Sequence, residues 1–190
     1  MRKESWLAAL GTLAVAGALS GCGSNGIAAA ALEATGLRKP PELPDALKAP
    51  RTVALRLHAS PTLNLDKRGQ PLALTVRLYK LRQKDAFERT PYAAFLDPQA
   101  ERASLGPDLV EVREIMLVPG QRYEVQEKVG REASHLAVVA LFQRPAQGRW
   151  RTAVAAADAE REGVSIGLHA CALTVGGSGQ AATLSSVRCQ

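Results

Sequence analysis

Apolar and polar residues alternate in two segments of the chain that follow position 51. Val53, Leu55 and Leu57 fall on one face of an extended segment, and residues 72–78 repeat the alternation. A period of two residues is typical of a strand that is buried on one face only. Residues 60–71, between the two segments, are rich in Pro, Asn, Asp and Gly, which predicts a loop.

Strand-like sequence continues along the rest of the chain, with one interruption. Residues 84–103 have aromatic residues spaced for short helical turns, broken by Pro91 and Pro98. About eight short strands with one small helical insert predict an all-β fold, a β-sandwich. The remaining predicted strands lie in residues 109–118, 121–128, 135–143, 149–155, 164–168 and 172–175.

The N-terminal segment has a different pattern. Two basic residues, Arg2 and Lys3, precede an apolar run that ends in Leu-Ser-Gly-Cys at residues 19–22. This layout resembles a bacterial lipoprotein signal, with cleavage after Gly21 and lipid attached to Cys22. An ordinary secretory signal with a chance cysteine is the alternative. The apolar run is shorter than a bilayer-spanning helix and is interrupted by glycine, which disfavours a transmembrane segment.

These patterns divide the chain into three parts. Residues 1–21 are predicted to be the signal peptide, and residues 22–51, which contain several prolines, a lipidated N-terminus with a flexible tether. Residues 52–190 are predicted to form the β-sandwich domain with a C-terminal tail. Gly23, and not an aspartate, follows the cysteine, which in lipoprotein families implies the outer membrane.

Net charge and the distribution of basic and aromatic residues bear on whether the protein binds nucleic acid. The formal net charge is +6, and aromatic residues make up 4% of the chain, so the core must be built mainly from aliphatic side chains. Lys and Arg are scattered and no aromatic residues alternate with them. Nucleic-acid binding is therefore not expected.

Two cysteines remain if Cys22 carries lipid. Cys171 and Cys189 are then an even pair in an oxidising compartment, which predicts a disulfide between them. Two unpaired thiols are the alternative, because sequence alone does not bring their Cα atoms together.

One motif suggests catalysis, but its context argues against it. Residues 163–167 match the Gly-x-Ser-x-Gly nucleophile elbow, yet Ser165 alternates with apolar residues as in a strand, and no acidic residue follows it. The three histidines, His58, His135 and His169, share no metal-ligand spacing. No catalytic residue, metal site or cofactor is therefore predicted.

Several short motifs occur in an order that points to one family. The most specific is Val-Arg-Leu-Tyr-Lys-Leu at residues 76–81, followed by the helical insert around Phe87. Other motifs are at residues 63–66, 69–72, 92–96, 105–110, 117–120 and 149–151. Together they resemble the TssJ family, the outer-membrane lipoproteins of the bacterial type VI secretion system. The resemblance implies a transthyretin-like β-sandwich without catalytic activity.

The resemblance also implies partners and a binding surface. A TssJ protein is lipid-anchored at the periplasmic face of the outer membrane and binds the periplasmic C-terminal region of TssM, in a complex that includes TssL. In that family the loop between the first two strands contributes to TssM binding. The corresponding exposed residues here would be Thr62, Leu63, Asn64, Leu65, Asp66, Lys67 and Arg68.

Two accounts of this loop remain open. In the first, Leu63 and Leu65 are apolar anchors of an interface, with Asn64 and Asp66 giving hydrogen bonds at its rim. In the second, the leucines fold inward and cap the sandwich. Without the resemblance, a solvated hairpin loop would be the better interpretation.

The alternative function comes from a different class of protein. A periplasm-facing lipoprotein could bind a small hydrophobic ligand or a lipid in a cavity of the sandwich. The apolar positions, however, are sufficient for a filled core and little more. A ligand that copurifies with the protein would distinguish this function from partner binding.

Overall fold

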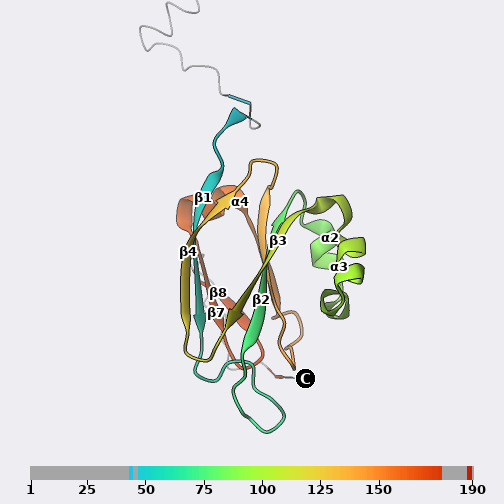
Figure 1. Cartoon of the computed structure of the whole chain (residues 1–190), viewed down its shortest axis with the longest axis vertical. Helices are drawn as coiled ribbons and strands as arrows, with labels where there is room; N and C mark the ends of the chain where they lie inside the picture. The colour runs from blue at the N-terminus through green and yellow to red at the C-terminus, as the bar shows by residue number, and fades with distance from the viewer. Residues whose placement is uncertain (1–42, 45–46, 177–187, 190) are drawn as a thin grey trace, which may run out of the picture. The chain divides into compact units, whose positions relative to one another are not determined.

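Two four-stranded sheets form the framework of the part that the structure describes, residues 43–44, 47–176 and 188–189 (Figure 1). The structure is a computed structural model. The predicted signal peptide, Cys22 and most of the predicted tether lie outside the described residues, as does most of the C-terminal tail.

The first sheet, which we call the β1 sheet, has the strand order β4-β1-β7-β8. Strands β1 and β7 are parallel, and the other neighbours are antiparallel. The second sheet, the β2 sheet, is antiparallel throughout and has the order β3-β2-β5-β6. The bounds are β1 Arg51–Ala59, β2 Leu74–Leu81, β3 Leu109–Leu117, β4 Arg122–Val129, β5 His135–Ala140, β6 Arg151–Ala155, β7 Val164–Leu168 and β8 Leu173–Gly176.

The core lies between the sheets and follows the predicted alternation. Val53, Leu55 and Leu57 on β1 have no exposed surface, and Val76 and Leu78 on β2 are also buried. Residues at alternate positions of a strand share one face of its sheet, so each sheet presents a mainly apolar face to the other. One ion pair, Lys80 on β2 with Glu127 on β4 at 3.0 Å, also joins the two sheets. The predicted β-sandwich is confirmed.

The predicted helical insert is also present, between β2 and β3. It lies against the outer face of the β2 sheet (Figure 1). Asp97 begins its longest helix, because its carboxylate accepts a hydrogen bond from the backbone N–H of Gln99 at 2.8 Å. The insert comprises α2 Asp85–Arg89, the 3-10 turn η2 Tyr92–Leu96, α3 Pro98–Leu105 and the 3-10 turn η3 Gly106–Asp108.

A further helix, α4 Ala156–Glu162, was not predicted. It joins β6 to β7, and buries Ala156 and Ala159. Gly163 follows with φ +72°, a left-handed conformation that suits the end of a helix. A helix of seven residues with alanine as its only apolar residue type shows little of the apolar periodicity that identifies longer helices.

Cys171 and Cys189 are joined in the structure. Their sulfur atoms are 2.01 Å apart and their Cα atoms 5.5 Å apart, which agrees with the predicted pairing. The bond ties the end of the described chain to the segment between β7 and β8.

Candidate partner-binding surface

The loop between β1 and β2, residues 60–73, is attached firmly at its base. The backbone N–H of Ser60 donates to the carbonyl of Leu168 at 2.8 Å, and that of Leu65 donates to Ala170 at 2.9 Å. Asn64 makes a third such bond, to the carbonyl of His169, at 3.0 Å. The loop base is therefore held against the segment that follows β7.

Leu63 and Asn64, predicted to be exposed, are buried. Leu63 has 0% exposure and belongs to the main core, so the account in which it folds inward is correct for this leucine. Asn64 is 5% exposed and has φ +47°, a conformation that asparagine adopts more readily than most residues. Its side chain donates to the carbonyl of Ala73 and accepts from the backbone N–H of Gln143, both at 2.8 Å.

The loop tip is exposed and internally ordered. The carboxylate of Asp66 accepts hydrogen bonds from the backbone N–H groups of Arg68, at 2.7 Å, and Gln70, at 2.8 Å. Gly69 completes the turn with φ +77°. Lys67 and Arg68 are consecutive in the sequence and both are exposed to solvent. Leu65 is half-buried. The tip therefore offers two cations in a fixed turn, which lowers the ordering cost of binding.

The loop and the start of the sandwich lie at opposite ends of β1. Figure 1 shows the loop projecting from the end of the sandwich that is remote from Arg51. Strand β1 has nine residues, which at about 3.3 Å per residue separates the two ends by roughly 30 Å. A partner seated on the loop would thus be held a strand's length from the point where the chain enters the sandwich.

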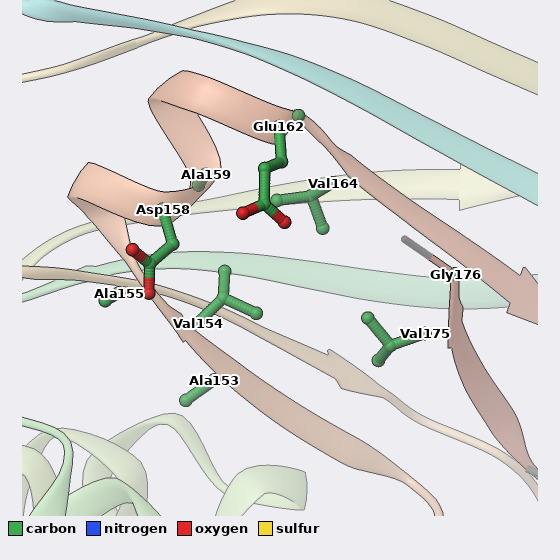
Figure 2. A pocket seen from close by; sticks show the side chains of 10 residues that line it. Ala153, Val154, Ala155, Asp158, Ala159, Glu162, Val164, Val175 and Gly176 are labelled. Atoms are coloured by element: carbon green, nitrogen blue, oxygen red, sulfur yellow. The ribbon is translucent and has the colours of Figure 1, made fainter. Parts of the chain in front are cut away.

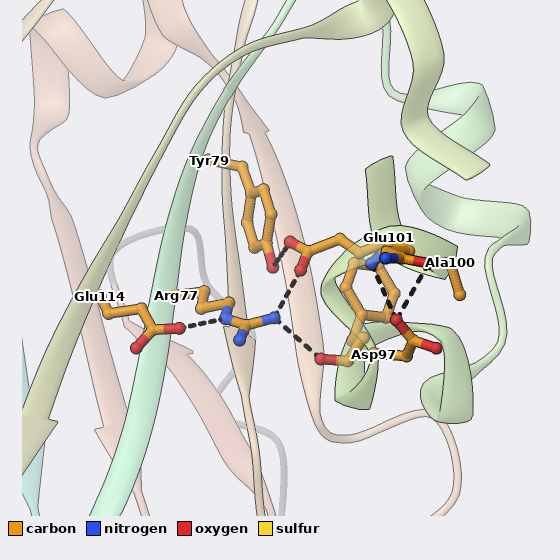
Figure 3. Close-up of polar contacts among 8 residues, drawn as sticks. Arg77, Tyr79, Asp97, Ala100, Glu101 and Glu114 are labelled. Atoms are coloured by element: carbon orange, nitrogen blue, oxygen red, sulfur yellow. Dashed lines mark hydrogen bonds and ion pairs between the residues drawn. The ribbon is translucent and has the colours of Figure 1, made fainter. Parts of the chain in front are cut away.

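A buried ionic group holds the helical insert in place on the β2 sheet. Glu101 on α3 accepts from the hydroxyl of Tyr79 at 2.5 Å and pairs with the guanidinium of Arg77 at 2.5 Å (Figure 3). Arg77 also donates to Glu114 at 2.7 Å and to the carbonyl of Phe95 at 2.8 Å. Burial and the hydrogen bond to Glu101 raise the pKa of Tyr79 well above its usual range. Each partner is satisfied, so this cluster is structural.

A hollow of about 360 Å³ lies between β6 and α4 on one side and β7 and β8 on the other. Figure 2 shows the carboxylates of Asp158 and Glu162 on its α4 side, with Val154 and Val175 on the strands. Two carboxylates in the wall suit a purely apolar ligand poorly. The hollow therefore gives no support to the small hydrophobic ligand of the alternative function.

Residues 164–167 of the apparent nucleophile elbow lie on a strand, and Gly163 precedes it at the end of α4. Ser165 is within β7, opposite Gly176 of β8, and not on a turn into a helix. His135 contacts Ser134, whereas His58 and His169 line one common hollow. Among the described residues, no group of three or more His, Cys, Asp or Glu side chains could hold a metal ion.

Comparison with known proteins places the chain in a family. Residues 51–171 match the family described as type VI secretion lipoprotein, VasD, EvfM, TssJ, VC_A0113. That span includes the sandwich up to the segment after β7, and the chain belongs to this family. No protein with a curated description matches it.

Solved structures agree with the family. The type VI secretion lipoprotein TssJ1 from Pseudomonas aeruginosa is 31% identical, with a TM-score of 0.61 over 69% of this chain and 98% of that one. A chain of a structure described as the TssM C-terminal domain from EAEC is 25% identical, with a TM-score of 0.57 over 66% and 97%. Serratia marcescens Lip, described as a membrane-bound component of the type VI secretion system, shares the fold at 18% identity, with a TM-score of 0.59 over 69% and 99%. The sandwich is therefore transthyretin-like, as the TssJ resemblance implied.

The part of the chain that the structure describes contains no helix long and apolar enough to cross a membrane.

Proposed function

We propose that this protein is a non-catalytic, outer-membrane lipoprotein of the type VI secretion membrane complex. It binds the periplasmic C-terminal region of TssM and, with TssL in the same complex, anchors the trans-envelope assembly. The observation that carries the proposal is the family match across residues 51–171. The match to a chain of the structure described as the TssM C-terminal domain supports TssM as the partner.

The membrane anchor in this proposal is lipid on Cys22. Residues 1–21 are removed as the signal peptide, and residues 22–50 form the tether, since Arg51 is the first residue of β1. Several acyl chains hold a protein stably because each buried CH₂ contributes about 0.8 kcal/mol. Membrane fractionation of cells that produce the wild type and the Cys22→Ser variant tests the anchor. Recovery of the serine variant in the outer membrane would contradict it.

The binding surface in this proposal is the exposed part of the loop: Thr62, Leu65, Asp66, Lys67 and Arg68. The buried Leu63 and Asn64 fix its base and do not meet the partner. Leu65 is the remaining apolar anchor, and the two cations form the polar rim. A loop that is already ordered loses less entropy on binding than a flexible one.

A charge-matched pair of variants tests this surface in the full chain. Replacing Lys67 and Arg68 by alanine should weaken TssM binding about tenfold or more, because both cations lie at the tip. The control replaces Arg89 and Arg102, two exposed arginines of the helical insert, and removes the same charge. Equal losses in both variants would mean that only net charge matters and would refute the loop assignment.

A further inference from the structure

Near the loop, the outer face of the β1 sheet carries a row of polar residues. In the strand register, His58 on β1 lies opposite Arg122 on β4 and Gly167 on β7. Thr174 on β8 lies opposite Gly167 on its other side. These positions alternate with Leu57 and Ile166, which are buried in the core, so the row faces outward.

Gly167 has no side chain, and the side chains of Thr174 and His169 occupy the space beside it. A Cβ atom there would lie 2.6 Å from the hydroxyl oxygen of Thr174 and 3.0 Å from Nε2 of His169. Those two atoms are 3.1 Å apart and form a hydrogen bond across the glycine. The hollow beside this glycine has a volume of about 510 Å³ and is lined by His58, Ala59, Ser60, Pro61, Gly120, Arg122, Gly167 and His169.

The residues that line this hollow carry only positive charge, and exposed Glu124, two residues along β4 from Arg122, lies opposite Arg56 and outside the lining. Of the described residues that line it, none is acidic. The guanidinium of Arg122 has no ion pair or hydrogen bond with any described side chain. Burial lowers the pKa of His169, which favours the uncharged form of its imidazole. Arg122 therefore supplies a permanent cation to a hollow that His58 and His169 also line, a combination that matches a carboxylate.

The place of the hollow in the fold indicates what fills it. Ser60 and Pro61 line it and also begin the β1–β2 loop, so the hollow and the loop form one continuous surface. Together with a lining that carries only positive charge, this continuity favours an acidic group of a protein that is seated on the loop.

We propose that this hollow receives an acidic side chain of the protein partner that docks on the β1–β2 loop. The inference rests on the proposed function, since the partner is taken to be TssM. It adds a second point of attachment, with Arg122 as the residue that selects a carboxylate at that position. A contact of this kind fixes the orientation of a partner that the loop tip alone would leave free to pivot.

Binding of the full chain, extracted in detergent, to the periplasmic C-terminal region of TssM from the same bacterium tests the inference. Arg122→Gln should weaken binding about tenfold, whereas Arg122→Lys should stay within about threefold because the charge remains. Arg89→Gln, on the helical insert, is the control and should not change binding. Raising the salt concentration should weaken the wild type more than Arg122→Gln, since the variant has lost the charge that salt screens.

The outcomes separate this inference from the proposed function. If loss of the loop cations weakens binding and Arg122→Gln does not, the acidic contact is overturned and the proposed function stands. If Arg122→Gln and Arg122→Lys are equally weak, shape and not charge matters, and the inference is again overturned. If the wild-type chain does not bind TssM, the proposed function fails, and the inference fails with it. Selective loss in Arg122→Gln, with the predicted salt response, supports the inference.

Discussion

The two sheets of the sandwich have outer faces with opposite properties. The outer face of the β2 sheet is covered by the helical insert, and its contact buries Tyr79, Phe87 and Phe95. The ring centroids of these three residues lie 5.6 to 5.9 Å apart in tilted and edge-to-face pairs. The outer face of the β1 sheet instead presents charged side chains to solvent: Arg56 and Arg122, with Glu124 opposite Arg56.

Because of this difference, we expect the two faces to contribute to different properties, the covered face to stability and the open face to partner binding. Apolar aromatic packing and satisfied buried charges stabilise a face that needs no partner. Exposed charges on an open face cost little in water and remain available to a partner of opposite charge, as Arg122 does. We therefore expect substitutions on the covered face to change the free energy of unfolding, and substitutions on the open face to change partner binding.

The largest expected effect is at the centre of the covered face. Phe95→Ala should lower the free energy of unfolding by about 4 kcal/mol, because Phe95 is fully buried among aromatic rings. Urea unfolding of the full chain measures the change. Its neighbour Leu96, 59% exposed, is the matched control, and Leu96→Ala should cost less than about 0.5 kcal/mol. Equal losses at the two positions would show that the insert is not packed on the sheet.

The ionic group beneath the insert should show the next largest effect. Glu101→Ala should destabilise the protein by about 3 kcal/mol, because it leaves Arg77 and the hydroxyl of Tyr79 without their buried partner. Glu114→Ala removes the other carboxylate that Arg77 contacts, but Glu114 is exposed to solvent. We expect less than about 1 kcal/mol there. A larger loss at Glu114 than at Glu101 in urea unfolding would contradict this arrangement.

The buried Tyr79 on the covered face should also make the free energy of unfolding depend on pH in the alkaline range. Burial raises the pKa of Tyr79 in the folded protein above its ordinary value of 10.0. The unfolded chain therefore loses this proton first, and stability that is intact below pH 10 declines as the pH rises further. Between pH 9 and pH 11, Tyr79→Phe should lose about 1 kcal/mol less than the wild type. Parallel pH profiles for the two proteins would rule out this contribution from Tyr79.

The smallest expected effect on stability is on the open face. Arg56→Gln should change the free energy of unfolding by less than about 0.5 kcal/mol, since Arg56 is exposed on the β1 sheet. Thermal unfolding beside the Phe95→Ala variant checks this directly. A loss above about 1 kcal/mol would mean that the open face also carries structural contacts.

Much of the sandwich could be predicted from sequence because alternation has a direct physical cause. A strand with one buried face must place its apolar residues at every second position, as Val53, Leu55 and Leu57 do. The helical insert was predictable because its apolar residues, from Phe87 to Leu96, have helical spacing, and Pro91 and Pro98 limit its turns to short lengths. Helix α4 gave no comparable signal.

The binding surface was predictable only in part. Leu63 and Leu65 are both leucines of the same loop. Only the tertiary fold determines that Leu63 is buried and Leu65 is half-exposed. A possible signal was Asn64, because an asparagine in a tight loop can take the left-handed conformation that turns the chain inward. The cationic hollow gave no signal, since it depends on the register of β1, β4 and β7, which are far apart in sequence.

Hydrogen exchange of the full chain, with and without the periplasmic region of TssM, tests the central claim most directly. The account predicts slower exchange on binding in the loop, residues 60–73, and in the segment 167–170 beside the hollow. It predicts no change in the helical insert, residues 85–105. Protection confined to the insert, with an unchanged loop, would contradict the assignment of binding to the loop end of the open face.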